Sequence, residues 1–460
     1  MPEARTAAVR AGDDGANPRT APADPVVVLR SRRYLVLLVV AAVLGAPVAA
    51  VAYGFLKLLT LMQGWAYTDV PDVFGFAAVP WWWPVVPLVV AGVIVGLTVR
   101  YLPGRGGEVP VEGFKPGGRA EPRALPGIAV AAAASIGLGA VVGPEGPLVA
   151  LGGGLAYLAV HLAKRDLPVQ AGAVVAAAGS FAAISTLLGS PLAGAFLLME
   201  ASGLAGATAT LVLVPGLLGA GIGALIFTGL DSLTGYGQFS LAIPTLPPAA
   251  VPTVAEFGWA IVIGLAAPPL CMGIRWLALA VSRYTEQRPV LLTPLVGLVV
   301  AAVAIGYAES TGKPFSDVLF SGQEELPGLV ENGATYSIGA LLLLLVCKAL
   351  AYGASLSSFR GGPTFPAMFI GAAGGVAMAH LPGLTLVPAV AMGIGAMTVG
   401  ILRLPLTSVL VTTLFLGADG FLTMPLVIVA VVISYVATIR LSPAPTPTPE
   451  VQPPVPAQAR

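Results

Sequence analysis

The stretch GPEGPLVALGGG at residues 143–154 decides how this chain folds, because it places a carboxylate between two prolines inside a strongly apolar run. Proline suits the first turn of a helix, where its missing N–H would have no intrahelical partner. Glycine lets another group approach the backbone closely. The stretch therefore predicts a helix that begins within apolar surroundings and carries Glu145 at its start.

A helix start of this kind favours a bound anion. Unpaired N–H groups and the positive end of the helix dipole act together there. Burial disfavours the charged form of Glu145, whereas the helix start favours it. Deprotonated, the carboxylate would occupy the anion site; protonated, it would leave. We therefore expect Glu145 to be a gate, a proton carrier, or both. The alternative is a capping carboxylate at the membrane surface without a role in transport.

A second stretch, GGPTFPAMFIGAAGG at residues 361–375, has similar glycines and prolines but no acid. Pro191 follows the first stretch and Pro405 follows the second after a similar interval. Paired, interrupted apolar segments are typical of inverted-repeat transporters and point to their binding site, although a chain with 57 glycines and 42 prolines can also match by chance. We expect the two stretches to converge on one cavity near the bilayer midplane. The expected anion-binding residues, acting through the backbone, are Gly143, Gly146, Pro147, Gly362, Pro363, Thr364 and Phe365.

The composition of the whole chain requires lipid around it. Hydrophobic residues make up 57% of the 460 residues and charged residues only 10%, whereas soluble domains carry roughly a quarter of charged residues. The net charge of +1 argues against a surface for nucleic acid. Two cysteines and two histidines supply neither a disulfide framework nor a metal cluster, so no cofactor or metal is expected. The sequence predicts an all-α polytopic membrane protein with tilted and broken helices.

The chain divides into two tails and one membrane domain. Residues 1–29 are rich in Ala, Pro, Asp and Arg, which predicts a disordered cytoplasmic tail. Arginines directly before the first apolar run place the N-terminus in the cytoplasm. Residues 30–440 form the membrane domain, with inverted halves at about 34–229 and 254–440, and residues 441–460 form a Pro-rich disordered tail. We expect a multi-pass protein of the plasma membrane with both termini cytoplasmic.

Several apolar runs, such as 126–162, 168–200 and 405–440, exceed the roughly 20 residues that cross a bilayer. We expect each long run to hold two helices or one tilted helix. Lys348 and three other basic residues interrupt such runs, and we expect their side chains to reach the membrane surface. Glu200 ends another run and has two readings, as a cap on a neighbouring helix or as a proton-handling group.

Three motifs in register resemble one family. GPEGP at 143–147 resembles the Gly-Lys/Arg-Glu-Gly-Pro signature of the CLC chloride channels and transporters. GGPTFP at 361–366 resembles their Gly-x-Phe-x-Pro signature with the Phe displaced by one place, and SPLAG at 190–194 is similar to the start of their next helix. The resemblance extends over residues 34–440 and implies the short form without CBS domains. It also implies a homodimer with one pore per subunit, chloride at helix N-termini, and Glu145 as the external gating glutamate.

Some positions depart from the family pattern. GGEVP at 106–110 stands where the family has Gly-Ser-Gly-Ile-Pro, so Gly107 takes the place of the chloride-facing serine. Ala201 takes the place of the internal proton glutamate, and Glu200, one residue earlier, is the candidate substitute relay. The late tyrosine has no counterpart, because Tyr435 lies too early. We therefore expect a voltage-gated-chloride-channel type of activity that is channel-like or weakly coupled to protons.

Other functions remain open at this stage. Within the family they are a proton-coupled chloride antiporter and an exporter of fluoride or another anion. Outside it, an inverted-repeat transporter of organic solutes would need more polar side chains in its broken helices. An enzyme is not expected, because an intramembrane serine protease needs Gly-x-Ser-x-Gly and a membrane histidine. The expected partners are a small anion such as chloride, protons, the lipid bilayer and a second copy of the chain, with no nucleic acid.

Overall fold

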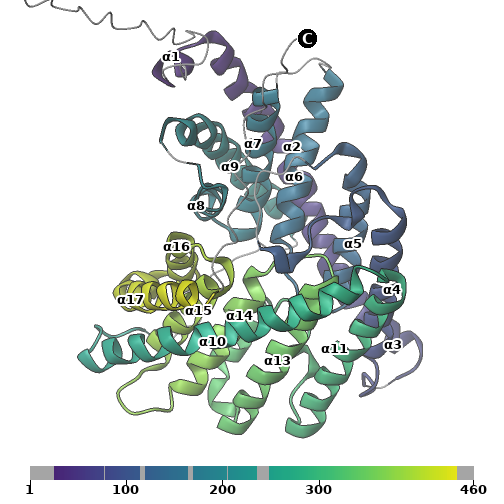
Figure 1. Ribbon diagram of the computed structural model, residues 1–460, viewed down its shortest axis with the longest axis vertical. Coiled ribbons are helices and arrows are strands. Elements are labelled where there is room, and N and C mark those ends of the chain that lie inside the picture. Colours follow the sequence, from purple (N-terminus) through teal and green to yellow (C-terminus); the bar gives the residue numbers. More distant parts are fainter. Residues whose placement is uncertain are drawn as a thin grey trace, which may run out of the picture.

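The structure, a computed structural model, describes residues 25–76, 78–113, 120–163, 169–204, 206–235 and 248–442 (Figure 1). Across these residues the elements are helices, with one isolated β-bridge between Gly143 and Gly362. Eight of the described helices are long and apolar enough to cross a membrane. The predicted all-α polytopic membrane fold is confirmed. Most of both predicted tails lies outside the described residues.

The first half of the chain runs from α1 to α9. The bounds are α1 Pro25–Leu29, α2 Arg32–Gly64, α3 Val70–Val73, α4 Val85–Tyr101, α5 Leu125–Gly137, α6 Glu145–Ala163, α7 Val169–Leu188, α8 Pro191–Ser202 and α9 Gly206–Thr234. A π-helical turn, Trp65–Asp69, joins α2 to α3. Residues 25–29, expected as the end of the tail, instead form α1, because their apolar run packs on α2 and α9.

The second half runs from α10 to α17. The bounds are α10 Val254–Thr285, α11 Pro289–Thr311, α12 Glu325–Glu331, α13 Ile338–Ser358, α14 Thr364–Met378, α15 Leu386–Leu402, α16 Pro405–Phe415 and α17 Ala418–Leu441. Each half also has a non-membrane linker in the corresponding place. The first linker (residues 102–124) joins α4 to α5, and the second linker (residues 312–337) joins α11 to α13.

The two halves repeat one pattern of packing. In the first half α7 packs on α6, α8 and α9, and in the second half α15 packs on α14, α16 and α17. Helix α2 covers α7 and α9 as α10 covers α15 and α17. In Figure 1 most of the first half, purple to teal, lies above the green and yellow second half, and α4 lies against α11. This repeat is the predicted CLC-type architecture.

The long apolar runs each hold two helices, as expected. The run 126–162 breaks between α5 and α6, and the run 168–200 breaks at Gly189 and Ser190. The run 405–440 breaks at Leu416 and Gly417. Gly189, directly after α7, has a φ of 58°, and Gly417, directly before α17, has a φ of 59°; glycine adopts such positive φ values without the steric cost that other residues bear. The breaks therefore follow from the glycines inside the runs.

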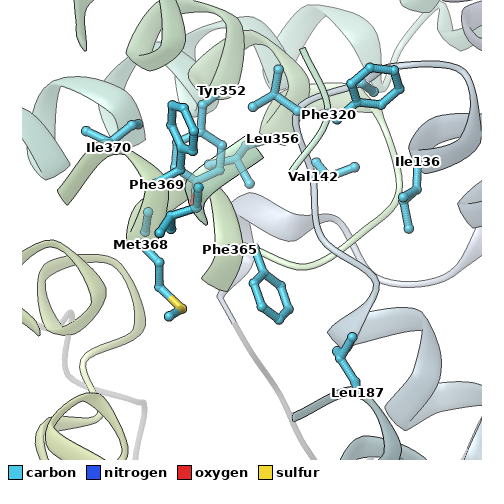
Figure 2. Packing of buried hydrophobic residues seen from close by; sticks show 14 of the residues in the cluster. Ile136, Val142, Leu187, Phe320, Tyr352, Leu356, Phe365, Met368, Phe369 and Ile370 are labelled. Carbon is cyan, nitrogen blue, oxygen red and sulfur yellow. The ribbon is translucent and has the colours of Figure 1, made fainter. Parts of the chain in front are cut away.

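The start of α14 is embedded in an apolar cluster. Phe365 and Phe369 of α14, Tyr352 of α13 and Val142 of the first half belong to this cluster, and Figure 2 shows Phe369 beside Tyr352 and Phe365 on another side of the helix start. The exposed fraction of each of these four side chains is 2% or less. The backbone groups at the helix start therefore lie in a medium of low dielectric constant, where a hydrogen bond or a charge has a larger effect than in water.

Candidate functional site

The two broken segments, residues 143–147 and 361–366, lie side by side at the junction of the two halves. The N–H of Gly143 donates to the carbonyl of Gly362 at 2.8 Å, and the N–H of Gly362 donates to the carbonyl of Gly143 at 2.5 Å. A Cβ added to Gly146 would lie 3.3 Å from the carbonyl oxygen of Gly361. The two segments therefore lie together as expected, while a shared cavity near the bilayer midplane and a role in binding stay predictions.

Glu145 is the first residue of α6, and only 1% of it is exposed. Its Oε1 accepts a hydrogen bond from the backbone N–H of Thr364, the first residue of α14. Its Oε2 and the Thr364 hydroxyl are both buried and have no hydrogen-bond partner among the described residues. The carboxylate of the first half therefore occupies the helix start of the second half.

The seven expected backbone contacts reduce to three. Pro147 and Pro363 are wrong as donors, because proline carries no N–H. The N–H groups of Gly143 and Gly362 are used in the bridge between the segments. The remaining donors are those of Gly146, Thr364 and Phe365, which belong to the first turns of α6 and α14. N–H groups in a first turn have no partner within their own helix.

Three hydrogen bonds that the sequence did not reveal hold the segments in place. The Tyr352 hydroxyl of α13 donates to the carbonyl of Pro363 at 2.6 Å. The Ser355 hydroxyl oxygen accepts the N–H of Val141 at 3.1 Å. The N–H of Arg360 donates to the Ser135 hydroxyl of α5 at 3.0 Å. The signal available in the sequence was weak: single hydroxyl groups within apolar runs near each Gly/Pro stretch.

Two cavities reach the site, one from each linker. The large cavity, of about 350 Å³, is lined by the first linker and by Gly146, Pro147, Gly361 and Pro363. The small cavity, of about 30 Å³, is lined by the second linker, by α2 and by Pro144. The first broken segment therefore contributes to the walls of both cavities, at Pro144 in the small one and at Gly146 and Pro147 in the large one.

The structure shows where two positions that depart from the family pattern lie. Gly107 lines the large cavity without a side chain, and its φ is 95°. Ala201 lies next to the C-terminal end of α8, where its methyl group has neither donor nor acceptor.

Glu200 receives three hydrogen bonds from the start of α16. The N–H of Leu406 donates to Oε1 at 2.9 Å, and the N–H of Thr407 donates to Oε2 at 2.7 Å. The Thr407 hydroxyl also donates to Oε2, at 2.6 Å. Helix α16 has no side-chain cap of its own. In the structure Glu200 therefore caps a neighbouring helix, which is one of the two roles that the sequence left open. The other role, as a proton relay, stays a prediction.

Lys348 does not reach the membrane surface, and that expectation was wrong. The side chain of Lys348 on α13 has an exposed fraction of 0%. Its Nζ donates to the carbonyls of Leu319 at 2.7 Å and Phe320 at 3.3 Å, and it lies 4.4 Å from the ring centroid of Phe369. The second linker offers the ammonium group these partners inside the protein, so it has no need to extend to water.

Carboxylates complete the buried charge cluster. Glu325 lines the small cavity and Asp317 lies nearby, and both interact electrostatically with Lys348. The hydroxyls of Tyr307 and Tyr336 donate to Asp317 Oδ2 at 3.1 and 3.0 Å. Burial raises the pKa of the Glu325 carboxyl, and the positive charge of Lys348 partly offsets that rise. The cluster ties the second linker to α11 and α13.

Comparison with known proteins agrees with this architecture. The ion-transport protein YfeO of Escherichia coli O7:K1 (strain IAI39 / ExPEC) is 28% identical over 360 residues, which cover 77% of this chain and 81% of that protein. A slow cyanobacterial Cl⁻/H⁺ antiporter has a TM-score of 0.72 at 20% identity, covering 88% of this chain and 94% of that one. A CLC-type fluoride/proton antiporter has a TM-score of 0.65 at 21% identity, covering 88% and 96%.

A family model described as voltage gated chloride channel matches residues 108–438. The match includes both broken segments, the second linker and most of the repeat. It begins after Gly107 and ends inside α17. Together with the paired helix starts that meet at Glu145 and Thr364, this match shows that the chain belongs to the voltage-gated chloride channel (CLC) family.

Proposed function

We propose that this protein carries small anions, chloride first among them, across a membrane, with Glu145 as the gate. One observation carries the proposal: the buried Glu145 carboxylate accepts the N–H of Thr364 at the start of α14. An anion arriving at that helix start needs the same N–H, so the carboxylate and the anion exclude each other. Protonation of Glu145 removes its charge and frees the site.

The hydrogen-bond donors at the site are suited to the passage of an anion more than to its tight binding. They are backbone N–H groups of Gly146, Thr364 and Phe365, which carry partial charge. Weak donors hold an anion well enough for it to enter and loosely enough for it to leave. Residues of the first broken segment line both cavities, which supports an approach of the anion to the helix starts through them. These features support conduction of a desolvated small anion through the junction of the two halves.

Weak or absent proton coupling is part of the proposal. A relay to Glu145 needs a titratable group on the way, and Ala201 supplies none. The nearest acid in sequence, Glu200, already accepts three hydrogen bonds from α16. These hydrogen bonds hold the Glu200 carboxylate at the start of α16, which supports a structural role as a cap over a role as a proton carrier.

The second candidate function is proton-coupled exchange. Two of the similar structures are described as a Cl⁻/H⁺ antiporter and a fluoride/proton antiporter. Liposomes under a chloride gradient, without a proton gradient, separate the candidates. We expect little or no uphill proton movement in this protein. Robust proton pumping would favour the antiporter instead, and fluoride in place of chloride in the same assay tests the exporter.

We also propose a homodimer in the plasma membrane with both termini cytoplasmic. Large apolar side chains are exposed on the neighbouring helices α8 and α16, among them Leu192, Phe196 and Leu406. The family resemblance implies that a second copy covers a face of this kind. Cross-linking in native membranes would test the dimer, and a migration at the mass of one chain would contradict it.

The gate is tested by Glu145→Gln in liposomes. Glutamine resembles the protonated acid and lacks the competing charge. We expect wild-type chloride flux to rise as the pH falls, because protonation of Glu145 frees the site, and the variant to conduct equally at all pH values. The control is Glu286→Gln, an exposed acid after α10. An unchanged pH dependence in Glu145→Gln would remove the gate assignment.

A further inference from the structure

Three helices of the second half bring two arginines close to each other. Helices α10, α15 and α17 pack against one another and lie side by side in Figure 1. Arg275 belongs to α10, and Arg403 directly follows the last residue of α15. Both side chains are partly buried, and their two positive charges repel each other. This part of the fold therefore holds two like charges between helices that are otherwise apolar.

The neighbours of the two arginines belong to one junction of the three helices. On α10, Cys271 lies one turn before Arg275, and a Cβ added to Gly400 of α15 would lie 2.5 Å from the Cys271 Sγ. The same Cβ would lie 3.6 Å from the hydroxyl oxygen of Thr438 on α17. Gly400 lies three residues before Arg403, which is less than one helical turn. The helices therefore meet about one turn away from both guanidinium groups.

Among the described residues, no carboxylate pairs with either arginine at this junction. Arg275 makes no hydrogen bond or ion pair within the part of the chain that the structure describes. The Nη2 of Arg403 donates to the hydroxyl oxygen of Ser442 at 2.8 Å, and that partner is neutral. Like charges in partly apolar surroundings repel each other more strongly than in water. An anion that binds between the two guanidinium groups would remove this repulsion.

Two buried polar atoms at the junction have no hydrogen-bond partner among the described residues. They are the Nε of Arg403 and the hydroxyl oxygen of Thr438. Thr438 is 2% exposed and lies one turn before Ser442, whose hydroxyl contacts Arg403. A buried donor without a partner is unfavourable, and native proteins leave few of them. These two atoms point to an acceptor at the junction, independently of the charges.

The surface around the junction is apolar and exposed. Trp276, next to Arg275, is 71% exposed, and Ile439 and Leu441 at the end of α17 are 45% and 51% exposed. Tryptophan side chains and the ends of spanning helices lie at the level of the lipid head groups. The apolar side chains would contact the acyl chains of a lipid there, while the arginines reach its phosphate.

We propose that Arg275 and Arg403 bind the phosphate of an anionic phospholipid where α10, α15 and α17 meet. The planar fork of a guanidinium matches two phosphate oxygens, and basic pockets between membrane helices bind anionic head groups. The Ser442 hydroxyl orients Arg403 for this contact. None of these residues lines either of the two cavities, so the inference is independent of the proposed transport function.

The wild-type protein provides the first test. Binding of single lipid molecules to the intact chain in detergent is measured by native mass spectrometry. Phosphatidylglycerol has a net negative charge, whereas the choline group of phosphatidylcholine cancels the charge of its phosphate. We expect phosphatidylglycerol to bind about ten times more tightly than phosphatidylcholine, and equal affinities would overturn the proposal. If inorganic phosphate binds as tightly as phosphatidylglycerol, the ligand is free phosphate and the assignment to a lipid is wrong.

Substitutions then locate the site. Arg275→Gln and Arg403→Gln should each weaken phosphatidylglycerol binding about fivefold, the usual contribution of one basic residue to the binding of anionic lipid. Arg283→Gln, at an exposed position near the end of α10, is the matched loss of charge. It should weaken binding less than about twofold, because water and salt screen an exposed charge. If a Gln variant does not fold, Lys at the same position keeps the charge without the fork and should weaken binding about two- to threefold.

Two results would defeat the site. If the Arg275 and Arg403 variants fold and bind phosphatidylglycerol as tightly as the wild type, the two arginines only stabilise the helices around them. If Arg283→Gln causes a loss as large as theirs, the lipid responds to the net charge of the protein and not to this junction.

Discussion

The first and second broken segments begin a helix in the same way in the two halves of the molecule, and they differ in the residue at which that helix begins. Helix α6 begins at Glu145, whereas its counterpart α14 begins at Thr364. Thr364 contributes a backbone donor, and Glu145 contributes a charge that competes for that donor. The repeat therefore duplicates the backbone geometry of a helix start, while the proposed response to protons depends on a single carboxylate at the start of α6.

The largest effect is expected from adding one methyl group to the second segment. A Cβ on Gly362 would overlap the carboxyl group of Glu145. We expect Gly362→Ala to expel the carboxylate from its place beside Thr364, and so to abolish the pH dependence of chloride flux as completely as Glu145→Gln does. Chloride efflux from liposomes across a pH series measures this.

The matched control for Gly362→Ala is Gly328→Ala. A Cβ on Gly328, within α12, meets nothing within 4 Å. Chloride flux through the Gly328→Ala variant should keep the wild-type pH dependence. If Gly362→Ala folds and also keeps that pH dependence, the carboxylate beside the second segment is not the gate, and the proposed difference between the two segments is wrong.

The second linker contacts the buried side chain of Lys348, and a substitution of Lys348 tests how much these contacts stabilise the protein. Lys348 is buried and interacts electrostatically with Glu325 and Asp317, and removal of a buried charge leaves the charges around it uncompensated, which costs about 3–5 kcal/mol. Lys348→Met should lower the free energy of unfolding by that amount, because Glu325, Asp317 and two carbonyls lose their partner. Lys313→Met, in the same linker but less buried, should cost less than about 1 kcal/mol. Thermal unfolding in detergent compares them, and equal losses would contradict the buried cluster.

A third contrast concerns how the short helices α8 and α16 begin. Helix α8 has its own cap, because the Ser190 hydroxyl oxygen accepts the N–H of Ala193 at 3.3 Å. Helix α16 depends on Glu200 from the other half. Glu200→Gln should therefore destabilise the protein by about 1–2 kcal/mol and leave the pH dependence of flux unchanged. A changed pH dependence in this variant would support the relay reading instead.

The smallest effect is expected at the Thr364 side chain. Its hydroxyl is buried without a partner among the described residues, while its backbone N–H binds Glu145. Thr364→Val keeps the shape and the N–H, so we expect a gain in stability of up to about 1 kcal/mol and an unchanged pH response. Unfolding and flux measured on the same preparation test both parts. A lost pH response would show that the hydroxyl, and not the backbone, is the donor that matters.

The local sequence pattern predicted the helix starts that form the site better than it predicted the hydrogen bonds and charge contacts between distant residues. Proline and glycine around Glu145 set the start of α6, and those around Thr364 set the start of α14, because these residues act on their own backbone. The partner of Glu200 lies 206 residues away in sequence, and Lys348 is buried by a linker that has no apolar period. The Glu200 contact depends on how the two halves dock, and the Lys348 contacts depend on how the second linker folds back on α13. Periodicity and propensity along the chain encode neither arrangement.

The reciprocal hydrogen bonds between Gly143 and Gly362 limit how this protein can move. Many transporters of repeated design work by rocking one half against the other around a fixed site. Here the halves are tied to each other at the site itself, so any such rotation would first have to break both bonds in apolar surroundings. Turnover is therefore expected to depend on the rotation of one side chain, a process of picoseconds to nanoseconds when unobstructed, and not on the slower reorientation of domains.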